Sequence, residues 1–208
     1  MAGGRVGLAT DTQDITGRML RESAAPVTRE ALEAALETQR GEIQQLPPMY
    51  SAVWVDGKRL YDLARKGREV ERPLRDVTIH RLELLDFDPA ERTCTLDVTC
   101  SKGTYIRTIC HDLGETLGCG GVLQSLRRTE TLGFTEAQCH TLEELGELCQ
   151  GGKLEEALLP VDAAFARYRK IYLSPTQARM FCSGAVLDTR RVRHPDTTQP
   201  LRVYEGGG

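Results

Sequence analysis

Hydrophobic and polar residues alternate along Thr93–Cys100 with the period of two that is typical of a strand with one buried face. The apolar positions are Cys94, Leu96, Val98 and Cys100. A second segment, Val77–Phe87, carries its apolar residues in two phases, which indicates a strand interrupted by a bulge. We expect the two strands to pair antiparallel across a turn at Asp88-Pro89.

A helix is predicted directly after these strands. Ser101-Lys102-Gly103 ends the strand pattern, and apolar residues then recur at helical spacing. They are Ile106, Ile109, Cys110, Leu113 and Leu117. Thr104 is the predicted N-cap and Gly118 the predicted C-terminal stop. Tyr105 and Arg107 therefore fall in or beside the first helical turn.

The remaining patterns predict further helices and another strand. Amphipathic helices are expected at Thr28–Arg40, capped by Thr28 and ended by Gly41, and at Thr141–Cys149, which starts with a capping box. A short basic helix, Lys58–Lys66, should follow a hairpin turn at Asp56-Gly57. Val122–Arg128 is predicted to be a short strand.

The N-terminal residues show no strand pattern. Met1–Gly4 is interpreted as a chain edge, and Arg5–Gly17 as the end of a strand followed by a polar turn. Asp11 and Asp14 are compatible with a catalytic or metal-binding role, but a turn-stabilising cluster explains them better. Gly17 permits a positive φ at the end of this turn.

Composition limits the possible classes of protein. The 208 residues are 40% hydrophobic, enough for one core and a small appendage, and no run is apolar enough to span a bilayer. We therefore expect a cytoplasmic protein. The seven cysteines are scattered without a CxxC pair, which favours free thiols over disulfides or a metal site. A thiol sensor at Cys110 or Cys119 is a weak alternative, since nothing marks either thiol as activated.

The formal net charge of -3 conceals two basic segments. One spans residues 58–75 and the other residues 167–193. Tyr50, Trp54 and Tyr61 lie among or near the basic residues of the first segment, a composition that suits contacts with phosphates and bases. A solvated charged face with a small satellite core is the alternative interpretation.

The predicted helix start after Gly103 suits an anionic ligand. Free N–H groups of a first turn, Lys102 and Arg107 all attract negative charge, and the ring of Tyr105 offers a surface for stacking a base. The same residues also fit a purely structural role, with Tyr105 half-buried and Arg107 in a surface ion pair.

Several blocks of the sequence resemble one family. CSKGTYIRTICHDLGETLGCGG, SLRRT, the TDT-x-D-x-x-G segment at Thr10–Gly17 and the Ile43–Gly67 block resemble, in the same order, the bacterial tRNA pseudouridine-55 synthases, the TruB family. The resemblance implies an α+β fold with a mixed, mainly antiparallel sheet and packed helices. It also implies an isomerase that converts the T-loop uridine of tRNA to pseudouridine without a cofactor.

The resemblance assigns roles to individual residues. Tyr105 and Leu126 would line the pocket of the flipped uridine, and Arg107 would pair with the catalytic aspartate. RNA contacts are expected at Lys58, Arg59, Arg65, Lys66, Lys102, Arg127 and Arg128. Val122 departs from the histidine that family members often carry at this position, which puts local RNA contacts there in doubt. The expected partner is the tRNA T-arm stem-loop, and the complete protein is expected to be a monomer.

The G-H-x-G-x-L-D-P-type motif that holds the family's aspartate does not occur in these residues. We therefore expect a family member without the N-terminal part of the catalytic domain and the end of the appendage, and inactive by itself. Its expected domains are residues 1–160, with an RNA-gripping insertion at about 43–75, and the start of an RNA-binding appendage at 161–208. An unpaired sheet edge and self-association are expected. The alternative function is a non-catalytic module that binds RNA stem-loops.

Overall fold

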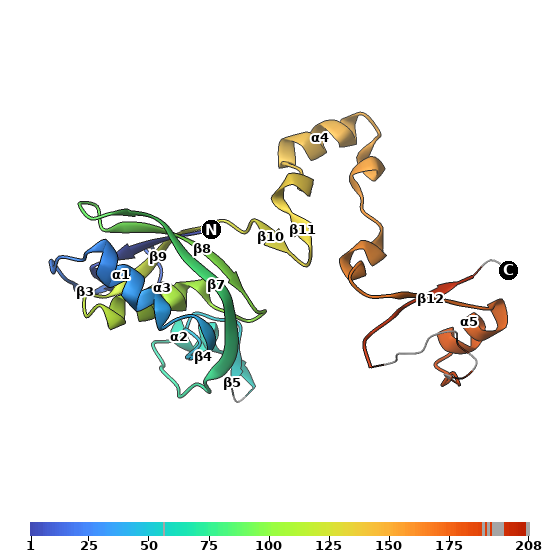
Figure 1. Cartoon of the computed structure of the whole chain (residues 1–208), viewed down its shortest axis with the longest axis horizontal. Coiled ribbons are helices and arrows are strands. Elements are labelled where there is room, and N and C mark those ends of the chain that lie inside the picture. Colours follow the sequence, from blue (N-terminus) through green and yellow to red (C-terminus); the bar gives the residue numbers. More distant parts are fainter. Residues whose placement is uncertain (56, 189, 191, 193–197, 207–208) are drawn as a thin grey trace. The chain divides into compact units, whose positions relative to one another are not determined.

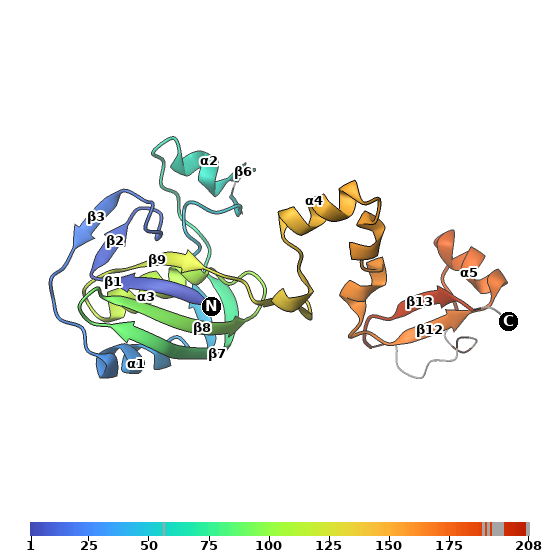
Figure 2. The same cartoon turned by 90° about the horizontal axis from the view of Figure 1, so that it is seen from above.

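A computed structural model describes residues 1–55, 57–188, 190, 192 and 198–206. The chain divides into two compact units, residues 1–128 and residues 129–208. Figures 1 and 2 show their elements. The boundary near residue 160 that we expect from the sequence refers to the domains of the family. The compact units do not test it, so it stays a prediction.

The first unit is built on a five-stranded sheet with the order β4-β7-β8-β1-β9, in which every neighbouring pair is antiparallel. Its strands are β1 (Ala2–Val6), β4 (Gly41–Gln45), β7 (Arg75–Asp88), β8 (Thr93–Cys100) and β9 (Gly121–Leu126). A separate hairpin joins β2 (Leu8–Thr10) to β3 (Met19–Glu22). The prediction of a mainly antiparallel sheet is confirmed.

The N-terminal residues correct one prediction, because Met1–Gly4 is not a chain edge outside the core. β1 is an interior strand that pairs with β8 on one side and β9 on the other. Ala2 is 1% exposed. Gly3 and Gly4 give the segment no strand pattern, since glycine contributes no side chain to alternate. An unpaired edge at the N-terminal strand is therefore not observed, and β4 and β9 are the outer strands of the order.

The β7–β8 hairpin is as predicted. The two strands pair antiparallel, and the register shifts between Ile79 and Arg81 and again between Leu84 and Asp86. These shifts account for the two phases of apolar residues along β7. Asp88 closes the turn, because its Oδ1 accepts hydrogen bonds from the backbone N–H groups of Ala90 at 2.8 Å and Glu91 at 3.1 Å.

The helices α1 (Arg29–Glu37) and α3 (Ile106–Thr116) share one apolar core with the sheet. Thr28 caps α1 as predicted, by accepting a bond from the Ala31 N–H at 3.2 Å, and the predicted stripe of Leu32, Ala35 and Leu36 is buried. The helix ends three residues earlier than expected. Gly41 instead begins β4 with φ +81°.

The first unit also contains a small hairpin and helix. β5 (Trp54–Val55) pairs with β6 (Lys58–Arg59), which confirms the hairpin, although Asp56 of its turn lies outside the described residues. α2 comprises Leu60–Ala64, so Lys58 and Arg59 belong to a strand and not to the predicted helix.

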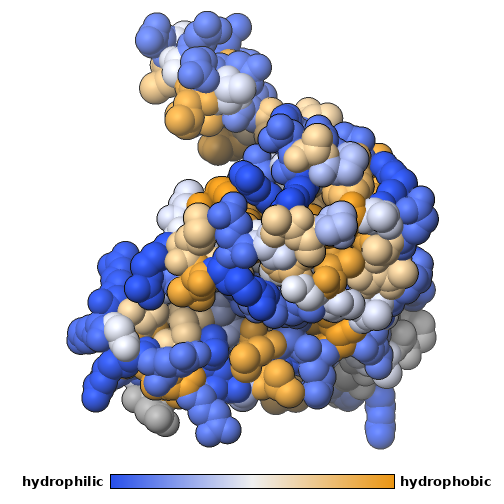
Figure 3. Space-filling view, turned by 90° about the vertical axis from the view of Figure 1, so that its left-hand side faces the viewer, coloured by the Kyte–Doolittle hydropathy of each residue, from blue (hydrophilic) through white to orange (hydrophobic). Residues whose placement is uncertain are grey.

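The face seen in Figure 3 is mostly hydrophilic, with apolar residues interspersed.

The second unit is a chain of short elements. They are β10 (Glu130–Thr131), β11 (Phe134–Thr135), η1 (Glu136–Gln138), α4 (Leu142–Gln150), η2 (Leu154–Ala157), η3 (Val161–Phe165), β12 (Lys170–Leu173), α5 (Pro175–Cys182) and β13 (Arg202–Glu205). β12 and β13 pair in parallel. The predicted capping box of α4 is present between Thr141 and Glu144. Part of the predicted appendage, at 189, 191, 193–197 and 207–208, lies outside the described residues. Within the described residues, the helices are too short or too polar to cross a membrane.

Candidate functional site

The candidate site begins at the N-terminus of α3. Gly103 makes the preceding turn with φ +86°, a conformation that glycine adopts without a steric penalty. Tyr105, not the predicted Thr104, is the N-cap residue. The Thr104 hydroxyl instead donates back to the Ser101 carbonyl at 2.9 Å. Tyr105 and Arg107 thus stand at the helix start, as predicted, and both are half-buried.

A buried glutamine holds this helix start. Gln45, the last residue of β4, is 1% exposed. Its Oε1 accepts the Tyr105 N–H at 3.0 Å, and its Nε2 donates to the Tyr105 carbonyl at 3.3 Å. A single side chain therefore satisfies both backbone groups of the N-cap residue.

The insertion between β4 and β7 contacts both candidate pocket residues. Arg107 Nη1 donates to the Tyr50 carbonyl at 3.4 Å. The ring of Tyr105 packs against a small apolar cluster centred on Val53, Leu60 and Leu63. A satellite core filled by the insertion's aromatic residues was the alternative interpretation of this segment. The observed cluster includes Tyr105 and not those aromatic residues.

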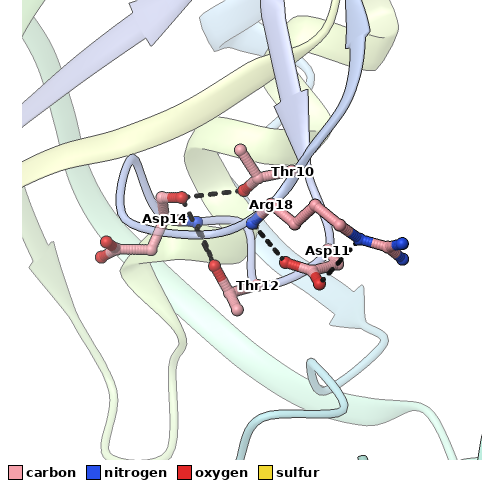
Figure 4. Close-up of polar contacts among 5 residues, drawn as sticks. All are labelled: Thr10, Asp11, Thr12, Asp14 and Arg18. Atoms are coloured by element: carbon pink, nitrogen blue, oxygen red, sulfur yellow. Dashed lines mark hydrogen bonds and ion pairs between the residues drawn. The ribbon is translucent and has the colours of Figure 1, made fainter. Parts of the chain in front are cut away.

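The polar turn before β3 is held by hydrogen bonds among its own residues (Figure 4). Thr10 Oγ1 donates to the Asp14 carbonyl at 2.8 Å, and the Asp14 N–H donates to Thr12 Oγ1 at 3.3 Å. Asp11 accepts the Arg18 N–H at 2.9 Å and forms an ion pair with its side chain at 3.7 Å. The prediction of a turn-stabilising cluster is confirmed.

Gly17 is needed in this turn for a different reason from the one predicted. Its φ is not positive, whereas that of Gln13 is +61°. A Cβ atom at Gly17 would lie 2.2 Å from Thr12 Oγ1, so the turn has no room for a larger residue.

The turn is attached to α3 through its side chains. Thr108, in the first turn of α3, is 1% exposed and donates from Oγ1 to Gln13 Oε1 at 2.8 Å. The backbone of Gln13 accepts the Leu123 N–H of β9 at 3.0 Å. The Asp14 segment, the start of α3 and β9 are thereby fixed to one another.

The β5–β6 hairpin and α2 carry a group of basic and aromatic residues that we call the insertion surface. It comprises Trp54, Lys58, Arg59, Tyr61, Arg65 and Lys66. The Arg59 guanidinium lies 5.3 Å from the ring centre of Trp54 and 5.8 Å from that of Tyr61, and Arg65 lies 5.5 Å from the Tyr61 ring. Trp54 is 62% exposed. Aromatic rings with stacked guanidinium groups suit contacts with nucleic-acid bases and phosphates.

The other predicted site residues lie elsewhere in the first unit. Lys102 is exposed in the turn before α3. Leu126 ends β9, is 53% exposed and belongs to neither apolar cluster of the described residues. Arg127 and Arg128 follow the strand, not within it as predicted, and Arg127 exchanges backbone hydrogen bonds with Met1. The structure therefore places Tyr105 and Arg107 together at the start of α3, and Leu126 at the exposed end of β9.

The remaining carboxylates and thiols considered in the first unit lie on the polar face of the sheet, along α3 or in the core. Asp97 forms an ion pair with Arg81 at 3.4 Å on the polar face of the sheet. Burial raises the pKa of Asp112, which lies well along α3. Burial also raises the pKa of Cys94 to about 11 and that of Cys110 still further. Within the described ranges, no group of His, Cys, Asp or Glu side chains is arranged to hold a metal ion.

Sequence reasoning missed the residues that hold the site together, namely Gln13, Gln45 and Thr108. Gln45 carried a usable signal, since it stands two positions after Ile43 on the inward face of a strand. A glutamine at such a position predicts a buried amide that needs specific partners. No sequence signal links Thr108 with Gln13, which are 95 residues apart.

Family models match most of the chain. The TruB family pseudouridylate synthase N-terminal domain matches residues 1–106, and the tRNA pseudouridylate synthase B C-terminal domain matches residues 107–166. Among solved structures, the Cbf5-Nop10-Gar1 complex is similar with a TM-score of 0.67 and 23% identity, over 92% of this chain and 50% of that one. At this identity the likeness shows the fold.

Relatives named tRNA pseudouridine synthase B extend the match. The protein from Azoarcus sp. (strain BH72) is 46% identical over 99% of this chain and 66% of its own length. That of Pseudomonas aeruginosa (strain UCBPP-PA14) is 46% identical over 98% and 66%, and that of Lactobacillus delbrueckii subsp. bulgaricus is 44% identical over 99% and 72%. The chain spans 66% of the length of the first two. With matches to both domains of one family, the chain belongs to the TruB family of pseudouridylate synthases.

Proposed function

We propose that this chain is the tRNA-binding and uridine-binding part of a tRNA pseudouridine synthase that acts on uridine 55 of the T-loop. The observation that carries the proposal is the joint placement of Tyr105 and Arg107 at the start of α3, beside the insertion surface. Three relatives that are 44–46% identical and named tRNA pseudouridine synthase B support the same activity.

The reaction sets the tasks of these residues. The N1–C1′ bond of the uridine breaks, the base turns over, and a C5–C1′ bond forms. The proton on C5 is lost to solvent and N1 takes up one proton, so substrate and product are isomers. The base must first leave the RNA stack, at a cost of a few kcal/mol that contacts in a pocket recover. Tyr105 would stack on the extruded base, with Leu126 beside it, and Arg107 would balance the charge of the nucleophilic aspartate.

The insertion surface would hold the stem of the T-arm. Lys58, Arg59, Arg65 and Lys66 would meet phosphates, with Lys102, Arg127 and Arg128 as further contacts. Such contacts position an RNA without reading its sequence. The proposed partner is thus an RNA stem-loop. We also propose that the complete protein is monomeric and cytoplasmic.

The test is binding of a labelled T-arm stem-loop across a salt series. A Lys58→Ala/Arg59→Ala/Lys66→Ala variant should bind more weakly, and the slope of log K against log salt should fall by about two to three, because each lost phosphate contact releases about one counterion fewer.

A control variant removes the same charge elsewhere. Arg21, Arg29 and Arg81 are 43–53% exposed and pair with Glu115, Glu33 and Glu83. Their joint replacement by alanine should change the slope by less than one unit. Equal losses in both triple variants would show that only net charge matters, and would contradict the assignment of the insertion surface.

A non-catalytic RNA-binding module is the second candidate. It is favoured by one observation, the insertion surface, whose exposed Trp54 ring and stacked Arg59 guanidinium suit contacts with RNA without a catalytic group. We expect this chain alone to bind the stem-loop without forming pseudouridine. A G-H-x-G-x-L-D-P-type motif encoded upstream in the reading frame would decide for the enzyme, and pseudouridine formed by these residues alone would contradict our expectation.

A further inference from the structure

Gln45 occupies a position where the fold calls for an apolar residue. Along β4, Ile43 and Gln45 point to the same face of the sheet, and Ile43 packs against the main core. Gln45 is almost completely buried. Burying an amide is unfavourable unless its oxygen and nitrogen both find partners, so the identity of those partners explains the residue.

Both partners are backbone groups of one residue of the candidate pocket, Tyr105. Oε1 accepts from the Tyr105 N–H and Nε2 donates to the Tyr105 carbonyl, across 60 residues of sequence. Two bonds from one planar amide fix both the position and the orientation of the peptide groups around Tyr105. The same carbonyl accepts the Thr108 and Ile109 N–H groups, so the contact reaches the hydrogen bonding of the first turn of α3.

The chain then runs from Gln45 to the second pocket residue. Pro47 and Pro48 are buried and stiffen the segment that leads to Tyr50, whose carbonyl accepts a bond from Arg107. The segment between Gln45 and Tyr50 thus contacts Tyr105 at one end and Arg107 at the other.

We propose that Gln45 is a positioning residue for the uridine pocket. By clamping the backbone of Tyr105, it sets the direction in which the Tyr105 ring and the Arg107 guanidinium project toward an extruded base. This inference rests on the proposed function and adds to it a residue that touches no RNA itself. Small displacements of a positioned group are sufficient to lose much of its effect.

The test compares two stem-loops that differ at one nucleotide. One carries uridine at the target position and the other an abasic site, so the ratio of their dissociation constants reports contacts with the base alone. Gln45→Met removes both hydrogen bonds at similar volume. Gln44→Met is the matched control, because Gln44 is the exposed neighbour on the same strand and bonds to Asp76.

The unsubstituted chain should prefer the uridine stem-loop by about tenfold, within the range expected for stacking one base. Gln45→Met should reduce this preference to less than about twofold while the affinity for the abasic stem-loop and its salt slope stay unchanged. Gln44→Met should keep the full preference. A Gln45→Met protein with an undiminished preference, or an unsubstituted chain that binds both RNAs equally, would overturn the proposal. Failure to bind either RNA at low salt would instead overturn the proposed function.

A second measurement requires no folded variant. The Tyr105 amide belongs to an N-cap residue, outside the hydrogen-bonding ladder of α3, and it donates to Gln45 Oε1. In the unsubstituted chain, its hydrogen exchange should be slow and should become slower with the uridine stem-loop than with the abasic one. Fast exchange of this amide, or equal exchange with both RNAs, would contradict the role of Gln45.

Discussion

At the residue scale, burial decides the chemistry of the cysteines. Cys94 and Cys110 lie in the core, where burial raises the pKa of Cys94 to about 11 and the pKa of Cys110 further, with a smaller contribution from the neighbouring Cys94. Cys119 is also buried, and its thiol faces the Gly120 carbonyl. Thiolates are the reactive species, so the idea of a thiol sensor at Cys110 or Cys119 has no support in these surroundings.

We predict a division of the cysteines by alkylation with iodoacetamide at pH 8. Cys139, Cys149 and Cys182 are exposed and should be modified in the native protein. The three buried cysteines should react only after denaturation, because the fold limits access to all three and burial raises the pKa of Cys94 and Cys110. Peptide mass spectrometry distinguishes the two groups. Modification of Cys94 or Cys110 in the native protein at the rate of Cys149 would show that the core opens readily.

The clearest failure of sequence reasoning is also at this scale. Alternating side chains predicted β8, and helical spacing predicted α3, because burial of one face leaves a periodic pattern. Gly3 and Gly4 of β1 leave none, although the strand lies inside the sheet. Gln45 was missed because its partners are backbone groups brought near only by the fold.

At the element scale, glycines set the distance between α3 and β9. A Cβ atom at Gly114 would lie 2.0 Å from the backbone of Gly120 and Gly121, and one at Gly121 would lie 2.1 Å from the Cys110 carbonyl. No such atom fits without moving the helix away from the strand. Within the GETLGCGG segment, Gly114 and Gly121 are therefore required by the contact that holds α3 against β9.

We predict that Gly114→Ala destabilises the first unit by about 1–3 kcal/mol, since overpacking forces a shift of backbone against backbone. Gly146→Ala is the matched control within another helix. Gly146 stands inside α4 with open space around it, so alanine there should stabilise the helix by about 0.5–1 kcal/mol. Urea unfolding followed by circular dichroism measures both changes. A neutral Gly114→Ala variant would mean that the contact between α3 and β9 is not tight.

Element boundaries show which predictions a pattern supports. The C-terminal end of α1 differs from prediction by three residues and the start of α2 by two, because the apolar positions fix the middle of a helix and not its terminal turns. In α4 the pattern predicted the helix and its cap correctly, yet Leu142 is 84% exposed. Periodicity therefore predicts the element without telling what covers it.

At the scale of the whole molecule, the two units differ in how many apolar residues they bury. Both apolar clusters lie within residues 1–128. Among the residues described in the second unit, Leu173 alone is a buried hydrophobic residue. Stability follows buried apolar surface, so the first unit should carry most of the free energy of unfolding.

Two helices of equal length provide the test. α1 and α4 each have nine residues and a capping threonine, but α1 buries Leu32, Ala35 and Leu36, whereas α4 buries none of its described residues. Isolated helices this short are marginal in water, so α4 has only its capping box and local contacts to keep it formed. Amide exchange in α4 should be at least about 100-fold faster than in α1, since local opening needs little free energy where no core is broken. Hydrogen–deuterium exchange measures this difference. Equal protection of the two helices would contradict the prediction and would show that α4 has a source of stability other than burial within the second unit.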